Sequence, residues 1–518
     1  MSLPYFNMEF LPYHSLLLLL PLILLPALYF FIASKAKKNV NAEKPNFPPS
    51  PPKIPILGNF HQLGSHPHRS LHNLSQKYGP VMLLQLGRIP TLIINSAEAA
   101  KQILKTHDLE FCTRPDLVRP KRLTYNNLDI AFAPYGEYWK EVRKVSVHEL
   151  LSMTRVQSFS AVREEEVADM IKSISATSSA SAPIDLFEKS LSLSDKIISR
   201  IAFGKRAQKG EKYENGRLKE IIYEAMAALG YMRASNFFPE VGWILDRLSG
   251  AYWETEKSFH DFDKFFQQVI DEHLDPARQK AEHDDIIDVL LKLEKDNPSS
   301  TVHFSHDHIK AILTNLFIAG VDTSAVTINW AMAELIKNPK AMKKVQDEVR
   351  SYMGKSKDKV EEKDLDQFPY LKMVVKETLR LHPPAPFLLP RESMTYSKVG
   401  GYDVYPKTRV LINAWGIGRD PACWEKPDAF YPDRFVDSSF DFTGQQSFEL
   451  VPFGGGRRGC PGVNMGLVTI ELALANLLYC FNWELPNGMK NEDANMDEVA
   501  GTIAAHMKDP LYLVPIKV

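Results

Sequence analysis

The strongest single pattern in the chain is an apolar run close to its N-terminus. From Leu16 to Ala33 there are 18 residues without a charge, and leucine dominates among them. A helix that crosses a bilayer core needs about 20 apolar residues, so this run is just long enough to span a membrane. No Lys or Arg precedes the run, as a cleaved signal peptide would require. The pattern predicts an uncleaved membrane anchor, and a buried core helix is the alternative.

The residues that follow the run predict its orientation and the next segment. Lys35, Lys37 and Lys38 come directly after it, and basic residues beside a membrane helix stay in the cytosol. We therefore expect a single-pass protein of the endoplasmic reticulum membrane whose main body faces the cytosol. The stretch Pro48–Pro55 is rich in proline, cannot form a helix and is typical of a semi-rigid spacer.

These patterns divide the chain into three parts. The prediction is an anchor over residues 1–35, a basic and proline-rich hinge over residues 36–56, and a catalytic domain over residues 57–518.

Beyond the hinge, short runs typical of β-strands flank a long stretch with helical periodicity. The β-like runs are Val81–Leu86, Thr91–Ile94, Val399–Val404, Arg409–Asn413 and Leu511–Val514. Helical patterns fill most of residues 97–355, for example Ser152–Ile174 and Asp263–Leu274. No second proline-rich linker follows, so the sequence predicts one large, mainly α domain with small β-sheets.

Charge and cysteine content narrow the possible functions. Lys and Arg number 62 against 63 Asp and Glu, so the chain lacks the basic excess that nucleic-acid binding needs, and nucleic acid is excluded as a partner. There are four cysteines without a repeating spacing: Cys112, Cys423, Cys460 and Cys480. This spacing argues against a disulfide framework and favours a reducing compartment.

The most informative stretch, Phe453–Gly462, surrounds one of these cysteines. Three consecutive glycines let the backbone approach a flat cofactor closely, and Arg458 can pair with a carboxylate through its fork of N–H groups. Cys460 precedes an apolar helical run, Val463–Leu478, and a helix N-terminus favours a thiolate. Because a metal ligand must be a thiolate, Cys460 is the candidate ligand. The other three cysteines are expected to be small buried hydrophobic residues.

The same glycines also fit a different motif. Residues 454–459 match the G-x-G-x-x-G fingerprint of dinucleotide-binding folds, with β-like Glu449–Phe453 before them and Glu484 further on. Such a fold needs further βα units, and too little chain follows Glu484 to complete a doubly wound sheet. A dehydrogenase is therefore a distant alternative.

A long helical pattern between Ser305 and Asn338 has an unusual interior. Its middle, Ala319–Ser324, consists of Ala, Gly, Val, Asp, Thr and Ser. A Gly inside a helix costs roughly 1 kcal/mol relative to Ala, so the helix is weakened where an acid and a hydroxyl come together. Taken alone, the pattern also suits an ordinary buried helix in which the Gly allows close packing and the polar residues face outward.

Two further pairs combine an Arg with a partner one helical turn away. Glu377 and Arg380 lie at i and i+3, and Trp139 and Arg143 lie at i and i+4. Individually the first is a common surface ion pair worth roughly 0.5 kcal/mol, and the second is packing beside a solvated charge. Only the ordered set of motifs gives them more weight.

Together these motifs resemble the cytochrome P450 family. Every fixed position of the family's haem-binding signature F-x-x-G-x-R-x-C-x-G is occupied, by Phe453, Gly456, Arg458, Cys460 and Gly462. The resemblance covers nearly the whole chain and implies the P450 fold, with haem b (iron protoporphyrin IX) as cofactor and Cys460 as the axial iron ligand. Gly459 departs from the pattern, because many relatives carry a larger aliphatic residue there.

The resemblance also implies roles for the other residues. Cofactor-binding residues are expected at Arg458, Trp139, Arg143, Arg391, Phe453 and Gly462, the arginines as contacts of the haem propionates. On the long helix, Gly320 would permit a local opening, Thr323 would hydrogen-bond the bound dioxygen or its water, and Asp322 would feed protons. A buried structural network is expected from Glu377, Arg380 and Arg434.

The implied reaction inserts one oxygen atom of dioxygen into a lipophilic small molecule. The implied partners are a separate NADPH-dependent P450 reductase, for which Arg457 and nearby lysines form the expected docking face, and membrane lipid. The sequence looks like the plant microsomal A-type group, which oxidises terpenoids, alkaloids, phenylpropanoids and amino-acid-derived oximes. Pocket walls are expected at residues 124–132, 229–232, 316, 319, 385–389 and 503–504.

Two rival functions remain within this resemblance. One is a P450-fold isomerase or dehydratase that does not use dioxygen, and the other is a non-catalytic haem-binding membrane protein. Thr323 and Asp322 argue against both, because neither function needs an oxygen-activation motif.

Overall fold

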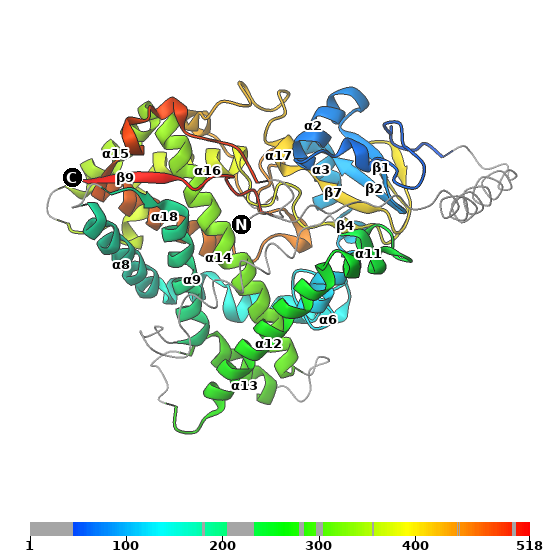
Figure 1. Ribbon diagram of the computed structural model, residues 1–518, viewed down its shortest axis with the longest axis horizontal. Coiled ribbons are helices and arrows are strands. Elements are labelled where there is room, and N and C mark those ends of the chain that lie inside the picture. Colours follow the sequence, from blue (N-terminus) through cyan, green and yellow to red (C-terminus); the bar gives the residue numbers. More distant parts are fainter. Residues whose placement is uncertain are drawn as a thin grey trace, which may run out of the picture. The chain divides into compact units, whose positions relative to one another are not determined.

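Helix α14 (His306–Lys337) is the central element of the fold and corresponds to the long helix expected between Ser305 and Asn338. Ser305 and His308 form a capping box at its start, and Pro339 begins the next helix, α15 (Pro339–Met353). In the computed structural model α14 packs along α9 (Leu186–Phe203) and α18 (Val463–Cys480) (Figure 1). A helix that is apolar on every side belongs in a core, and α14 has that character.

The structure describes residues 45–178, 182–204, 233–278, 284–296, 304–354, 357–442, 444, 446–499 and 504–518. Within them, residues 47–518 belong to one compact unit. The predicted anchor over residues 1–35 lies outside the described residues, as does the first part of the hinge. The anchor and the division at residue 57 therefore stay predictions.

The other helices precede and follow α14 along the chain. Those before it are α2 (Pro67–Tyr78), α3 (Ala97–Lys101), α4 (Asp108–Phe111), α5 (Val118–Leu123), α6 (Glu137–Val145), α7 (Met153–Ser158), α8 (Ser160–Ser178), α11 (Gly242–Leu248), α12 (Ala251–Leu274) and α13 (Ile286–Asp296). Those after it include α16 (Pro369–Leu381) and α17 (Ala414–Ile417).

In the described part of the chain the strands form three small sheets. They are β1 (Val81–Leu86), β2 (Ile89–Ile94), β3 (Ile184–Asp185), β4 (Arg391–Glu392), β5 (Ser397–Val399), β6 (Tyr402–Val404), β7 (Arg409–Ile412), β8 (Phe481–Glu484) and β9 (Tyr512–Lys517). The largest sheet has the order β1-β2-β7-β4, the second has the order β3-β9-β8, and β5 pairs with β6 alone. The prediction of a mainly α fold with small sheets is confirmed.

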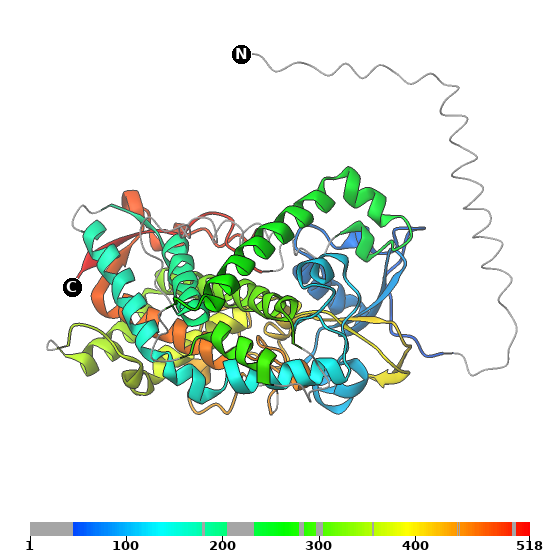
Figure 2. The same cartoon turned by 90° about the horizontal axis from the view of Figure 1, so that it is seen from below.

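The four-stranded sheet joins distant parts of the chain. Strands β1 and β2 form an antiparallel pair in which Val81 lies opposite Ile94. Strand β2 then pairs in parallel with β7, with Thr91 opposite Arg409. Both views place this sheet at the opposite end of the unit from α8 and β9 (Figures 1 and 2). The helices around α14 therefore form one part of the core and the sheet forms another.

The proline-rich stretch lies against this sheet where the structure describes it. The carbonyl of Pro49 accepts a hydrogen bond from the backbone N–H of Leu83 in β1. The carbonyls of Pro51 and Pro52 accept hydrogen bonds from the side-chain amide of Asn59. This part of the predicted spacer is therefore fixed to the folded unit.

Three local predictions differ from the structure. The helix expected over Ser152–Ile174 is interrupted at Phe159, between α7 and α8, although Val156 and Phe159 are buried in the same core cluster. Because the spacing of buried apolar residues stays helical across this turn, the sequence pattern does not reveal the break. The β-like run Val399–Val404 is a hairpin of two strands, β5 and β6, around Gly400 and Gly401. No strand forms at Glu449–Phe453, where the backbone is irregular.

Two described helices are long and apolar enough to cross a membrane, α14 and α18. In each of them most of the apolar window is buried inside the fold, 72% for α14 and 56% for α18. Burial of this kind is typical of core helices, so their composition does not indicate additional membrane spans.

Candidate active site

A large interior cavity contains the sulfur of Cys460. It measures about 330 Å³, against about 60 Å³ for a second cavity near α2. The loop before α18 forms one wall of the larger cavity, and Gly320 and Thr323 of α14 form another. The segment between Pro384 and Leu389 closes a further side. Two of the motifs singled out in the sequence therefore face the same space.

The cysteine loop folds tightly because of its glycines. Gly456 has a φ of +63°, and a Cβ at this position would lie 2.3 Å from the carbonyl oxygen of Leu104 and 2.4 Å from Oδ1 of Asp108. Only glycine fits there. The backbone N–H of Cys460 then donates to the carbonyl of Phe453 at 2.9 Å and closes the loop. Phe453 and Gly462 both line the cavity, and Gly462 immediately precedes α18.

Cys460 faces the cavity although it lies deep in the protein. Burial raises the pKa of its thiol, and the backbone N–H of Gly462 and the charge of Arg143 act in the opposite direction. A bound cation would deprotonate the thiol outright. The thiol is therefore positioned and accessible for metal coordination from the cavity side.

Arg458 is a buried cation held by the backbone. Its Nε donates to the carbonyl of Cys112 at 2.7 Å and its Nη2 donates to that of Ala133 at 2.5 Å. The guanidinium lies over the ring of Trp139, 4.0 Å from its centroid, and the indole N–H donates to the carbonyl of Ile130. Burial lowers the pKa of Arg458 to about 9.

Two further arginines line the same cavity. Arg143 donates to the carbonyl of Gly459 at 2.5 Å, which joins α6 to the cysteine loop. Arg391 donates to the carbonyl of Gly455 at 2.7 Å and forms an ion pair of 3.0 Å with Asp108. Burial lowers the pKa of both guanidinium groups.

This set of charges suits an anionic cofactor. Within the described residues, the hydrogen bonds of Arg143 and Arg458 all go to backbone carbonyls, so no carboxylate neutralises them directly. Buried charges require a partner of opposite sign. A flat metal-bearing cofactor with two carboxylates would supply both the ligand for Cys460 and the anions for the arginines. The residues present therefore fit an iron porphyrin.

The motif on α14 divides between two sides of the helix. Gly320 and Thr323 line the cavity, and the Thr323 hydroxyl donates to the carbonyl of Ala319 at 2.6 Å. Asp322 points away from the cavity into the protein and lies 3.2 Å from Nε2 of His506. The polar residues of this motif therefore do not face outward as in an ordinary amphipathic helix.

Glu377, Arg380 and Arg434 meet in one buried cluster. Glu377 accepts hydrogen bonds from Arg380 at 2.7 and 2.8 Å and from Arg434 at 2.9 Å. Arg380 also donates to the carbonyls of Gly418 and Pro427. The cluster fastens α16 to the segment that leads toward the cysteine loop.

Several residues that shape the cavity carry no motif in the sequence. Arg114 lines it and donates to the carbonyls of Ala131, Leu389 and Pro390. Asn315 of α14 accepts hydrogen bonds from the backbone N–H groups of Ile130 and Ala131. Each is a single polar residue far from its partners in the chain, so no local pattern identifies it.

Most of the expected pocket walls line this cavity. The lining includes Thr124, Ile130, Ala131, Phe132, Leu316, Ala319, Ala385, Leu388 and Leu389. Ala504 lines the smaller cavity, so the described residues do not place it in the main pocket. Residues 229–232 and Ile503 lie outside the described residues.

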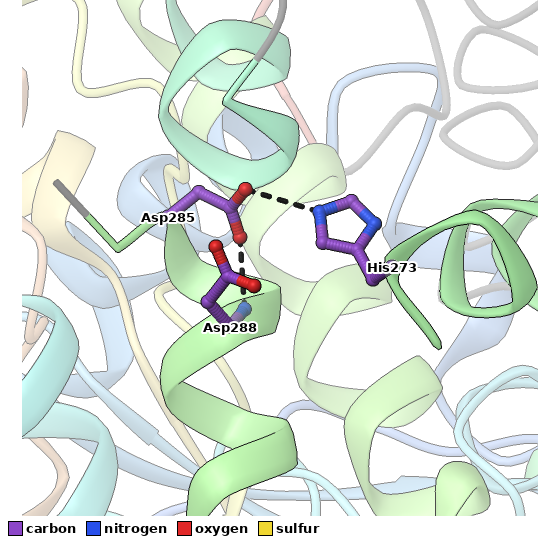
Figure 3. A group of neighbouring side chains, drawn as sticks. All are labelled: His273, Asp285 and Asp288. Carbon is purple, nitrogen blue, oxygen red and sulfur yellow. Dashed lines mark hydrogen bonds and ion pairs between the residues drawn. The ribbon is translucent and has the colours of Figure 1, made fainter. Parts of the chain in front are cut away.

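A second group of potential metal ligands lies elsewhere, at the ends of α12 and α13. Figure 3 shows His273, Asp285 and Asp288 pointing toward one another. Arg278 forms ion pairs of 2.6 Å with both carboxylates. Its guanidinium takes the position of a cation, so this group is an ion-pair cluster.

Comparisons with known proteins agree with the geometry. The family model described as Cytochrome P450 matches residues 48–511. Similar curated proteins include Cytochrome P450 71B20 of Arabidopsis thaliana, 47% identical over 96% of this chain and 98% of that protein. The 4-hydroxyphenylacetaldehyde oxime monooxygenase of Sorghum bicolor is 46% identical over 97% of this chain and 95% of its own length. The 2-methylbutanal oxime monooxygenase of Manihot esculenta is 45% identical over 96% of each chain.

A solved structure shares the fold at low sequence identity. A zebra fish cytochrome P450 determined with abiraterone superimposes with a TM-score of 0.72 at 23% identity. It covers 87% of this chain and 100% of its own.

Proposed function

Because the chain belongs to the cytochrome P450 family and is a cytochrome P450 monooxygenase, we propose that it oxidises a lipophilic plant metabolite with haem b bound to Cys460. The observation that carries the proposal is the accessible thiol of Cys460 in the same cavity as Gly320 and Thr323. Membership of this family excludes the dinucleotide-binding dehydrogenase. Similar proteins are named as monooxygenases, which favours an oxidative enzyme over an isomerase, a dehydratase or a non-catalytic haem-binding protein.

The haem would be held by the residues around the cysteine loop. Arg458, Arg143 and Arg391 would bind the propionates, because they bring buried positive charge to the cavity. Trp139 supports this arrangement through its contact with Arg458. When bound, the haem would supply the redox chemistry, with Cys460 as its thiolate ligand.

The α14 motif would handle dioxygen and protons. The Thr323 hydroxyl lines the cavity and donates its proton to the carbonyl of Ala319, so its oxygen could accept a hydrogen bond from a water or another protonated group in the cavity. Gly320 leaves space beside the Thr323 hydroxyl. Asp322 precedes Thr323 in the chain and lies on the side of α14 that faces His506. We assign Thr323 and Asp322 to oxygen activation, with Glu377, Arg380 and Arg434 as the structural support of the proximal side.

The substrate would be a small apolar molecule. The cavity lining includes many apolar side chains, among them Ile130, Phe132 and Leu388, which favour lipophilic ligands. Two of the similar proteins are named as oxime monooxygenases. Aldoximes are therefore the first class to screen, followed by terpenoids, alkaloids and phenylpropanoids.

Membrane attachment would bring the enzyme to lipophilic substrates and to its reductase. In addition to the predicted anchor, α11 and its flanks expose large apolar side chains: Val241, Trp243, Ile244, Leu245, Leu248 and Trp253. Exposed apolar residues with tryptophan are typical of helices that lie in a membrane interface. We assign the protein to the cytosolic face of the endoplasmic reticulum.

Electrons would come from an NADPH-dependent P450 reductase. Arg457 is a half-exposed residue of the cysteine loop and is held by Asp108 at 2.8 Å. Reductase-supported turnover should fall in Arg457→Glu if this surface receives the reductase. Unchanged turnover in this variant would exclude Arg457 from the docking face.

The test of the central assignment is the reduced carbon monoxide difference spectrum of the expressed protein. We expect the Soret band that gives the family its name in the wild type, in Thr323→Ala and in the control Cys480→Ala, whose cysteine lies outside the cavity. The band should be lost in Cys460→Ala. Folded wild-type protein without the band, or a Cys460→Ala variant that keeps it, would contradict the assignment.

A further inference from the structure

The carboxylate of Asp322 lies in an unusual environment. The residue is buried, its side chain being 3% exposed, and its Oδ2 accepts no hydrogen bond from the described part of the chain. Among the described residues, its ionic contact within 4.0 Å is His506, whose Nε2 lies 3.2 Å from this oxygen without the direction of a hydrogen bond. A buried carboxylate with an unsatisfied oxygen needs a partner. Within the part of the chain that the structure describes, the imidazole of His506 is the ionisable partner within reach.

The position of His506 is fixed mainly through the backbone around it. Its carbonyl accepts a hydrogen bond from the N–H of Val499 at 2.9 Å. The neighbouring carbonyl of Ala505 accepts one from the indole N–H of Trp330 in α14 at 2.6 Å. The imidazole itself meets the ring of Phe187 of α9 edge-on, with 5.4 Å between the ring centroids. Its side chain can therefore be replaced while the loop stays attached to α14.

The surroundings leave Asp322 as the ionic partner of His506. Among the described residues it is the only carboxylate within 4.0 Å of the imidazole. Glu498, from the same loop, is engaged by His68 and Arg69. Lys508 is exposed, and the group that α9 contributes, Phe187, does not titrate.

We propose that His506 is a positioning residue that holds the Asp322 carboxylate and supplies it with protons, an inference that rests on the proposed function. The reaction consumes the substrate, dioxygen, two electrons from NADPH and two protons. It yields a hydroxylated product and water, so protons must reach the oxygen atom that leaves as water. His506 is 15% exposed at its side chain, against 3% for Asp322, and histidine exchanges protons near neutral pH. It therefore links Asp322 to the exterior.

A purely structural role makes different predictions. If the imidazole only fastened the loop to α14, its loss would lower stability and all activities alike. If it supplies protons to Asp322, its loss should affect only the steps that consume protons. The two roles can therefore be separated by comparing turnover that consumes protons, with dioxygen and NADPH, with turnover that does not, with an oxygen-atom donor.

The first test needs no substrate and reads the imidazole directly. Histidine side-chain NMR of the intact holoenzyme observes the imidazole of His506, with His506→Gln to assign its resonances. We expect the ring resonances of His506 to shift in Asp322→Asn, because the carboxylate lies 3.2 Å from Nε2. They should not shift in the control Lys508→Gln. Unaltered His506 resonances in Asp322→Asn would overturn the coupling.

The second test compares two routes of turnover in His506→Gln and Lys508→Gln. With NADPH and reductase, His506→Gln should form at least about tenfold less product per NADPH, because general acid catalysis contributes roughly 10²- to 10⁴-fold. Hydrogen peroxide should be released instead. With iodosylbenzene, which donates an oxygen atom without protons, turnover should equal that of the wild type. The proposal would be overturned if His506→Gln formed as much product per NADPH as the wild type. It would also be overturned if turnover fell equally with NADPH and with iodosylbenzene.

The double variant His506→Gln with Asp322→Asn adds a check on the order of the two residues. If His506 acts through Asp322, the double variant should form as much product per NADPH as Asp322→Asn alone. Additive losses would contradict that order. A wild type without the carbon monoxide band would instead remove the proposed function itself, and the role of His506 with it.

Discussion

Gly320 of α14 and Ile198 of α9 approach each other so closely that a Cβ on Gly320 would lie 2.9 Å from Cδ1 of Ile198. Close packing, the ordinary explanation for a Gly inside a helix, is therefore a real property of this position. The same Gly lines the cavity beside Thr323, so one missing side chain both allows the two helices to pack and leaves room next to the hydroxyl.

We expect Gly320→Ala to lower the free energy of unfolding by about 1 kcal/mol. Overpacking a core costs roughly 1–3 kcal/mol, and Ala regains about 1 kcal/mol of helix propensity. In an Ile198→Val background, which removes the Cδ1 atom, the same substitution should be neutral or stabilising. Denaturant unfolding of the four proteins measures both effects, and equal losses in the two backgrounds would show that Ile198 is not the limiting contact.

Replacing Arg458 by Lys should reduce the haem content of the purified protein. Lysine keeps the charge but cannot reach the carbonyls of Cys112 and Ala133 together, and hydrogen bonds of charged donors contribute roughly 1.5–3 kcal/mol each. The ratio of haem to protein, read from absorbance after gel filtration, is the measurement. Arg88→Lys is a matched control, because Arg88 is not among the residues that line the cavity and is half-exposed. A full haem complement in Arg458→Lys would count against the propionate role.

Removing the carboxylate of Glu377 should be among the most destabilising single changes. Glu377→Ala leaves two arginines, Arg380 and Arg434, without their anion, and breaking a buried ion pair costs roughly 3–5 kcal/mol. Asp347→Ala serves as the control, because its pair with Lys343 is exposed and worth roughly 0.5 kcal/mol or less. Thermal unfolding compares the two, and similar shifts in melting temperature would refute the structural role of the cluster.

Glu471 of α18 should make the protein less stable as the pH rises. Burial raises the pKa of its carboxyl to about 7, so the folded protein binds this proton more tightly than the unfolded chain does. The stabilisation that comes from this bound proton is therefore fully present below the usual pKa of Glu, and it is lost as the pH rises from that value to about 7.

Glu471→Gln should remove this loss and stabilise the protein at pH 8 by up to about 3 kcal/mol, with no change at pH 4. Chemical unfolding at the two pH values measures the difference. The control is Glu484→Gln in β8, where the side chain is exposed. A stabilisation that is the same at both pH values would show that the effect does not come from the carboxyl's titration.

The elements that the sequence predicted well have strong local signals. Val81–Leu86 is a strand as predicted, because it is a short, almost entirely apolar run that Gly79 and Pro80 precede and Gly87 follows. The bounds of α14 were within a residue of prediction, because Ser305 caps its start and Pro339 stops its end. The break at Phe159 was missed because the buried positions Val156 and Phe159 keep a helical period across it.

The site was predictable only where its chemistry forms a motif. Cys460, Arg458 and Thr323 belong to short patterns, and the structure gathers them around one cavity. Asp108, which pairs with both Arg391 and Arg457, and His506, beside Asp322, are single residues whose partners lie far away in the chain. Only the fold brings such pairs together, so a single sequence could not reveal them.

The parallel pairing of β2 with β7 has a consequence for how the protein is made. The two strands are separated by roughly 300 residues, and ribosomes add about 5–20 residues per second. The edge of β2 therefore waits for tens of seconds before its partner is synthesised. Contacts this distant along the chain slow folding, so the nascent sheet presents an open edge to other chains and to chaperones during synthesis.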